Sequence, residues 1–167
     1  MTTPDFIIEI FLQPAEFYWG DSDTRIKTLL GSCVAICIWH PKLKIGGMSH
    51  CLLPSRMNDM KPPSELSGRY IDEAMELFIN EISKAGVKTQ EFNVKLFGGG
   101  DMFKDIWKAS GQTVGQRNIE MAHQMIAKYG MKILAENVGG QGHRNIIFDL
   151  WSGDVWMRQG IPGGVKK

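Results

Sequence analysis

This chain of 167 residues has few cysteines, no long apolar stretch and almost no net charge. It has three cysteines, an odd number, and residues 1–5 lack the basic start and apolar stretch of a signal peptide. We therefore expect a cytoplasmic protein with reduced thiols rather than a disulfide framework. No stretch approaches the roughly 18 apolar residues of a membrane span. The formal net charge of +1 leaves no basic excess for nucleic acid or an acidic membrane surface.

Glycine-rich segments are present, but they do not have the spacing of phosphate-binding loops. Neither residues 98–100 nor residues 139–142 precede a Gly-Lys-Ser/Thr sequence, and neither has the G-x-G-x-x-G form that opens a dinucleotide-binding helix. We expect no nucleotide cofactor. The glycines are instead expected to let the backbone pass close to another element or to a substrate.

The cysteines and histidines are not spaced as metal ligands. Cys33 and Cys37 lie four positions apart in an extended segment, which separates them by roughly 13 Å, whereas a zinc–sulfur bond measures about 2.3 Å. The chain also has no C-x-x-C pair. Although His40, His50 and Cys51 are close in the sequence, we expect no metal site.

Many short apolar segments and two amphipathic ones predict an α+β (α/β) fold with mostly antiparallel strands. Hydrophobic residues make up 43% and charged residues 22% of the chain, which suits a globular domain. Residues 70–85 and 118–129 have apolar side chains at helical spacing and are each followed by a glycine, so they predict helices packed on one or both faces of the sheet. The expected strands are residues 7–12, 17–19, 26–30, 34–39, 45–53, 92–97, 131–135, 145–150 and 154–157, and the expected loops are residues 55–67 and 101–111.

The most informative pattern is a cysteine in the small-residue turn Gly31-Ser32-Cys33, with His50 seventeen positions later. The two strands between them predict a hairpin, and a two-residue loop at Pro41-Lys42 sets Cys33 directly opposite His50. Opposed Cβ atoms lie roughly 4.5–5.5 Å apart, within reach of a thiol–imidazole contact. A bulge at Gly46-Gly47 would send the two side chains to opposite faces. The pair fits a cysteine nucleophile with a histidine base. The alternative is a small buried cysteine and a histidine that is hydrogen-bonded in the core or lies at the surface.

The remaining candidates have simpler interpretations. Cys37 and Cys51 are expected to be small buried hydrophobic residues, with Cys51 on the face opposite to His50. Residues 115–118 have two possible roles: a helix cap or surface position, or a site lined by backbone donors at a helix N-terminus. Capping or a surface position is the simpler interpretation of Arg117, Asn118, His123, His143 and Arg144.

An ordered set of short motifs spans residues 25–158. In chain order they are Leu30-Gly31-Ser32-Cys33-Val34-Ala35, His50 with Leu52-Leu53-Pro54, Tyr70-Ile71-Asp72-Glu73-Ala74-Met75, Lys95-Leu96-Phe97-Gly98-Gly99-Gly100, Gly115-Gln116-Arg117-Asn118, and Gly139-Gly140 with Gly142. Together they resemble the CheD family of chemoreceptor glutamine deamidases. The chain departs from the family at His143, inserted into the usual Gly-Arg, and at Ser152, where the family often has threonine.

The resemblance implies a three-layer sandwich with two main helices, formed by residues 1–167 as one CheD-like domain with its core at residues 25–158. It implies deamidation of glutamine side chains on the cytoplasmic helices of methyl-accepting chemotaxis receptors, through a thioester on Cys33 with His50 as base. A threonine upstream of the cysteine is the family's third catalytic residue, and Thr28 is the candidate.

The same acyl chemistry would also hydrolyse a glutamyl methyl ester of the receptor, because the acyl group is identical. Some members of the family bind CheC, a chemotaxis phosphatase, which makes a CheC-like protein a second expected partner. The alternative to an enzyme is a non-catalytic module that docks on the receptor or on such a phosphatase.

Overall fold

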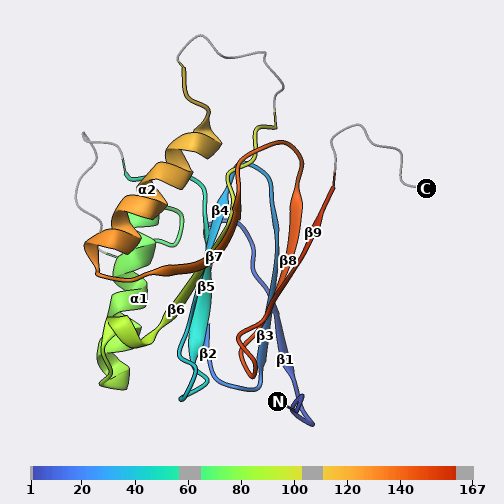
Figure 1. Cartoon of the computed structure of the whole chain (residues 1–167), viewed down its shortest axis with the longest axis vertical. Helices are drawn as coiled ribbons and strands as arrows, with labels where there is room; N and C mark the ends of the chain where they lie inside the picture. Colours follow the sequence, from blue (N-terminus) through green and yellow to red (C-terminus); the bar gives the residue numbers. More distant parts are fainter. Residues whose placement is uncertain (1, 57–64, 103–110, 161–167) are drawn as a thin grey trace.

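The computed structural model describes residues 2–56, 65–102 and 111–160, and these residues form three layers. Figure 1 shows two helices on one side, a five-stranded sheet in the middle and a four-stranded sheet on the other side. The elements in chain order are β1 (Ile8–Phe11), β2 (Phe17–Gly20), β3 (Thr24–Leu30), β4 (Val34–Trp39), β5 (Gly46–Cys51), α1 (Ile71–Ala85), a 3₁₀ turn η1 (Thr89–Glu91), β6 (Asn93–Gly98), α2 (Val114–Lys128), β7 (Ile133–Val138), β8 (Arg144–Asp149) and β9 (Val155–Gln159).

The two sheets are mixed but mostly antiparallel. The central sheet has the order β2-β5-β4-β6-β7 and the outer sheet has the order β1-β3-β8-β9. Only β1 with β3 and β6 with β7 pair in parallel among these neighbours, and the remaining pairs are antiparallel. The predicted α+β class, the three layers and the excess of antiparallel strands are therefore confirmed.

Strand β4 is buried on both faces because it lies in the middle of the sandwich. All six of its residues are buried. Val34, Ile36 and Ile38 belong to the core beneath the helices, whereas Ala35 and Cys37 belong to the core between the two sheets. A strand covered on both sides has no polar face, and this explains its uninterrupted apolar sequence.

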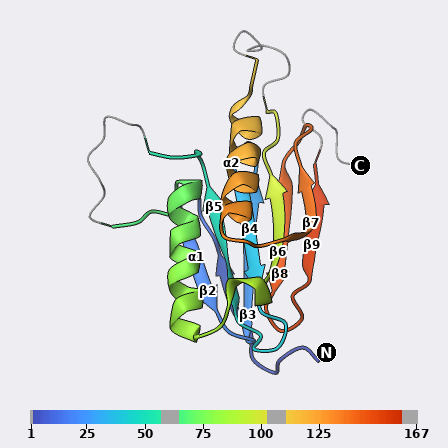
Figure 2. The ribbon, with the colours of Figure 1, turned by 60° about the vertical axis from the view of Figure 1, so that its left-hand side comes forward.

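Helices α1 and α2 cover the same face of the central sheet, as Figure 2 shows. Helix α1 ends where predicted, because Gly86 adopts the left-handed conformation with φ of 72°. Helix α2 begins at Val114, four residues before the predicted start. The amide of Gln116 donates to Thr113 Oγ1 at 3.1 Å and the amide of Thr113 donates to Gln116 Oε1 at 2.9 Å. The predicted start was set by the spacing of apolar residues and therefore missed this capping box, which is also a sequence signal.

Neither α1 nor α2, the two α-helices of the described residues, covers the far face of the outer sheet. Phe11, Leu29 and Trp156 are 58%, 48% and 59% exposed there. Of the two expected loops, residues 57–64 and 103–110 lie outside the described residues. No helix in the described part of the chain is long and apolar enough to cross a membrane.

Candidate active site

The hairpin of β4 and β5 carries Cys33 and His50, and its register differs from the predicted one. The structure places Ala35, not Cys33, opposite His50. The predicted two-residue loop is wrong because His40 pairs with Ile45 and not with Leu43, and the amide of His40 donates to the carbonyl of Ile45 at 2.8 Å. Four residues therefore form the turn.

The error in register is two residues, so it does not change the face of the sheet. Cys33 precedes Ala35 by two positions and lies on the same face, which makes Cys33 and His50 diagonal neighbours. Diagonal Cα atoms lie roughly 7–8 Å apart and their Cβ atoms somewhat closer. Gly46 and Gly47 form no bulge in the pairing with β4. Cys33 and His50 therefore face each other across the hairpin at a greater distance than directly opposed residues would.

His50 points into the space between the two sheets. Its side chain is 2% exposed, and its strand neighbour Met48 belongs to the core between the sheets together with Ala35. Cys33 packs against the same core but is partly exposed. A buried base thus lies behind a thiol that solvent can reach.

Thr28 comes to His50 from the other sheet. It lies on β3, where buried residues alternate with more exposed ones, and its side chain is 2% exposed. Its Oγ1 lies 2.7 Å from His50 Nδ1 and also 2.8 Å from the carbonyl oxygen of Leu12. The structure therefore brings together the three predicted residues from β3, from the turn Gly31-Ser32-Cys33 (the nucleophile turn) and from β5.

The two contacts of Thr28 fix the tautomer of His50. A hydroxyl has one hydrogen to donate, and a carbonyl oxygen can only accept. Because Thr28 donates to Leu12, it must accept from the Nδ1–H of His50. Nε2 of the neutral ring then carries the lone pair, which is the form a general base needs. The Leu12 carbonyl was not found from the sequence, since a backbone acceptor has no residue-type signal.

Burial disfavours charge on both members of the Cys33–His50 pair. It raises the pKa of Cys33, against the opposing effect of the positive charge of Arg69. It lowers the pKa of His50, against the opposing effect of the Glu16 carboxylate. No hydrogen bond joins Cys33 Sγ to His50 within the described ranges. Burial thus favours the neutral thiol and the neutral imidazole over an ion pair.

The other two cysteines are unsuited to nucleophilic chemistry. Cys37 and Cys51 are 1% and 0% exposed. Burial raises the pKa of Cys51 to about 12 and that of Cys37 higher still. Cys51 lies in the core beneath the helices, on the face opposite to His50. Their prediction as small buried hydrophobic residues is confirmed.

The nucleophile turn is held by the glycines of residues 98–100. The amide of Gly99 donates to the carbonyl of Cys33 at 2.8 Å, and the amide of Gly100 donates to Gly31 at 3.0 Å. Gly98 has φ of 106°, and a Cβ at this position would lie 2.2 Å from the carbonyl oxygen of Cys33. The expectation that these glycines permit close backbone approach is confirmed.

The buried side chain of Arg144 also donates hydrogen bonds to this region. Its side chain is 2% exposed, so its interpretation as a capping or surface charge is wrong. The guanidinium donates to Asn137 Oδ1 at 2.9 Å and to the carbonyl oxygens of Gly98 and Gly139. The sequence did not reveal this role because two of the acceptors are backbone carbonyls, which have no residue-type signal, and Gly98 lies 46 residues away in the chain.

Asn118 is the second polar residue whose role the sequence left open. It is fully buried, so the capping or surface interpretation is wrong for it too. Its Nδ2 donates to the carbonyl oxygens of Ser32, just before β4, and of Leu52, just after β5. The simpler interpretation is confirmed for Arg117, which is exposed, and for His123, which pairs with Glu136 at the surface.

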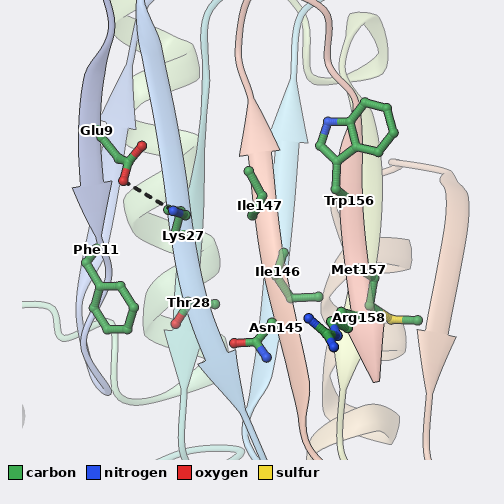
Figure 3. A pocket seen from close by; sticks show the side chains of 10 residues that line it. All are labelled: Glu9, Phe11, Lys27, Thr28, Asn145, Ile146, Ile147, Trp156, Met157 and Arg158. Atoms are coloured by element: carbon green, nitrogen blue, oxygen red, sulfur yellow. Dashed lines mark hydrogen bonds and ion pairs between the residues drawn. The ribbon is translucent and has the colours of Figure 1, made fainter. Parts of the chain in front are cut away.

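A hollow of about 470 Å³ lies on the outer face of the four-stranded sheet, and Figure 3 shows the side chains around it. Phe11, Lys27 and Trp156 line it, and an ion pair joins Lys27 to Glu9 at 3.2 Å. The Thr28 hydroxyl contacts His50 on the inner side of this sheet. Thr28 also lines the hollow, so the sheet at this residue lies between the hollow and His50.

Comparisons with known proteins find relatives over most of the chain. A family model described as CheD chemotactic sensory transduction matches residues 52–159. A relative from Pseudomonas savastanoi pv. phaseolicola, named probable chemoreceptor glutamine deamidase CheD, is 46% identical and covers all of this chain and 93% of its own length. The chain belongs to the CheD family.

Other CheD proteins match over almost the same span. The probable chemoreceptor glutamine deamidase CheD 3 of Dechloromonas aromatica is 44% identical, with 92% of this chain and 89% of the relative covered. The CheD 1 protein of Leptospira interrogans serovar Lai, named in the same way, is 40% identical, with 93% and 95% covered. Among solved structures, the hypothetical protein YfiH of Bacillus licheniformis has a TM-score of 0.47 at 10% identity, with 81% of this chain and 60% of that chain covered.

Proposed function

We propose that this CheD protein is a chemoreceptor glutamine deamidase in which Cys33 is the nucleophile, His50 the general base and Thr28 the residue that orients the imidazole. The observation that carries the proposal is the chain of contacts from Leu12 through Thr28 to His50 Nδ1. It leaves Nε2 as the base beside a partly exposed cysteine. The names of the relatives supply the substrate class, a glutamine side chain of a chemoreceptor.

The first step couples proton transfer to attack. Because burial favours the neutral form of both groups, His50 Nε2 takes the Cys33 proton as the sulfur bonds to the carbonyl carbon of the glutamine side chain. The imidazolium formed in this step keeps its Nδ1–H bond to Thr28. Thr28 carries no charge, but the negative charge of Glu16 favours the imidazolium, because it raises the pKa of His50 against the effect of burial.

The developing oxyanion needs donors, and the nucleophile turn offers them. The backbone amides of Ser32 and Cys33 donate no hydrogen bond to any described residue. Free amides at a nucleophile turn are suited to receive the oxygen of the tetrahedral intermediate. Loss of one such donor costs on the order of 10²–10³ in rate.

The second step releases ammonia and leaves a thioester. The imidazolium of His50 gives its proton to the departing amide nitrogen as the carbon–nitrogen bond breaks. Water then attacks the thioester with His50 again as base, which restores the thiol and yields glutamate. A glutamyl methyl ester would pass through the same thioester with methanol as the leaving group, so receptor methylesterase activity belongs to the same proposal.

The partners and the cellular setting complete the proposal. Residues 1–167 act as one CheD-like domain in the cytoplasm, where the cytoplasmic helices of methyl-accepting chemotaxis receptors are the substrate. A CheC-like phosphatase is a second partner, proposed from the family resemblance. Size-exclusion chromatography with a purified CheC-like protein tests that part separately from the chemistry.

The test of the enzymatic function is mass spectrometry of a receptor cytoplasmic domain incubated with the protein. Deamidation adds about one mass unit at each modified glutamine without chain cleavage, because it converts an amide to an acid. Cys33→Ala is the matched inactive variant, since it removes only the sulfur. Binding of the receptor without any change in mass would instead support the docking module, and cleavage of the chain would indicate a protease.

A further inference from the structure

Asn118, on helix α2, donates hydrogen bonds to both chain segments that carry the candidate site. It lies near the start of α2 and is fully buried. Its Nδ2 donates to the Ser32 carbonyl at 3.2 Å and to the Leu52 carbonyl at 2.9 Å. Ser32 immediately precedes the nucleophile Cys33, and Leu52 follows the base His50 by two positions. One side-chain amide thus ties the turn of the nucleophile to the strand of the base.

The orientation of the Asn118 amide is determined by its neighbours. A reversed amide would place Oδ1 against the two carbonyl oxygens, and oxygens without hydrogen repel one another. In the observed orientation Oδ1 is the one buried side-chain nitrogen or oxygen of the described residues that has no hydrogen-bond partner. Burial of Oδ1 without a partner is unfavourable for stability. The two hydrogen bonds that Nδ2 donates therefore point to a role of Asn118 in the site.

The bond to Ser32 fixes the direction of the Cys33 amide. The carbonyl of Ser32 and the N–H of Cys33 belong to one planar trans peptide, in which C=O and N–H point in opposite directions. Holding the carbonyl oxygen against Asn118 therefore aims the Cys33 N–H away from α2. That N–H makes no hydrogen bond within the described residues, as a donor for an oxyanion requires.

We propose that Asn118 is a positioning residue of the deamidation reaction, which aims the Cys33 amide at the oxyanion and holds the nucleophile turn at its distance from His50. This inference rests on the proposed deamidase function. It assigns to helix α2 a part in stabilising the transition state, beyond its part in covering the central sheet.

Asn118→Ala tests the inference because it removes both donors without adding charge. We expect kcat for receptor deamidation to fall roughly 10- to 100-fold, with KM changed less than about threefold, since the oxyanion forms only in the transition state. Alkylation of Cys33 by iodoacetamide breaks a carbon–iodine bond and forms no oxyanion. Its rate should fall less than about threefold in the same variant, and this difference is the signature of an oxyanion donor.

Asn118→Asp provides a second variant of nearly the same shape. Its ionised carboxylate cannot donate, whereas its protonated form donates one hydrogen bond, and burial raises the pKa of such a carboxyl. The kcat of this variant relative to the natural protein should therefore rise as the pH is lowered. Ile126→Ala, two helical turns further along α2 in the core, controls for loss of stability alone. It should lower the melting temperature without changing kcat below that temperature.

The outcomes separate the inference from the function on which it rests. Equal losses of deamidation and alkylation in Asn118→Ala, or an unchanged kcat, would overturn the role in aiming the Cys33 amide. If Asn118→Ala does not fold, the pH dependence of Asn118→Asp decides, and a pH-independent ratio overturns the inference. Persistent deamidation by Cys33→Ala would overturn the proposed function itself, whatever the Asn118 variants show.

Discussion

Thr28 Oγ1 lies 2.7 Å from His50 Nδ1 although the two residues belong to different sheets. The contact crosses the core between the sheets, so it forms only after the outer sheet has packed on the central one. The candidate site is therefore a property of the assembled sandwich. In the proposed mechanism the β4–β5 hairpin supplies the base, the turn before it supplies the nucleophile, and the outer sheet supplies the residue that orients the base.

Removal of the Thr28 hydroxyl should lower turnover without abolishing it. Thr28→Val keeps the branched shape and deletes the bond to His50 Nδ1, so the imidazole loses its fixed tautomer. We expect kcat to fall about 10- to 100-fold, less than the roughly 10²–10⁴-fold effect of losing a general base itself, whereas Thr28→Ser should retain most activity. Steady-state deamidation of a receptor fragment measures both variants. Natural turnover in Thr28→Val would mean that Thr28 is only a strand residue.

Iodoacetamide should label Cys33 and leave Cys37 and Cys51 unmodified in the folded protein. Cys33 alone is partly exposed, and burial raises the pKa of the other two far from neutrality. Because burial also raises the pKa of Cys33, its labelling in the substrate-free protein should keep rising above pH 8.5, the ordinary cysteine value. Peptide mass mapping after labelling at several pH values measures this. A plateau already reached at pH 6 would show a preformed thiolate instead.

The fall of kcat/KM at acid pH, the acid limb of the profile, should report the protonation of His50. Burial lowers the pKa of His50, so the neutral base persists below pH 6.5, and kcat/KM should fall only at lower pH. Glu16 opposes that shift, and Glu16→Gln should therefore move the acid limb to still lower pH. Glu9→Gln, on the outer face of the other sheet, is the matched control and should leave the limb in place. An upward movement in Glu16→Gln would contradict this assignment of charges.

Gly98→Ala should impair both stability and activity, because the added Cβ meets the Cys33 carbonyl and φ is positive. We expect a loss of roughly 2–4 kcal/mol in the free energy of unfolding from strain and overpacking together. Gly86→Ala is the matched control, since it has positive φ but no atom within 4 Å of the added Cβ. It should cost about 1 kcal/mol and leave deamidation unchanged. Denaturant unfolding and deamidation rates measure the two effects, and equal outcomes for both variants would refute the clash with Cys33.

Local patterns were sufficient for the elements that local forces determine. Helix α1 lies where its apolar spacing predicted it, and strand β4 lies where its continuous apolar run predicted it, because each buries a side-chain pattern contained within its own residues. The face shared by Cys33 and His50 was also predicted correctly despite the wrong register. The hairpin loop was two residues longer than predicted, and an even shift preserves the alternation of side chains.

The sequence by itself thus determined the elements, the layered α+β class and the candidate pair Cys33 and His50, while Thr28 came from the family resemblance. Tertiary structure alone decided that Leu12 accepts from Thr28, that Asn118 clasps the nucleophile turn and that Arg144 is buried. These contacts join segments far apart in the chain, and most use backbone carbonyls, which every residue carries. No residue pattern can mark such an acceptor, so its partner becomes known only when the packing of the sheets and helices places the two together.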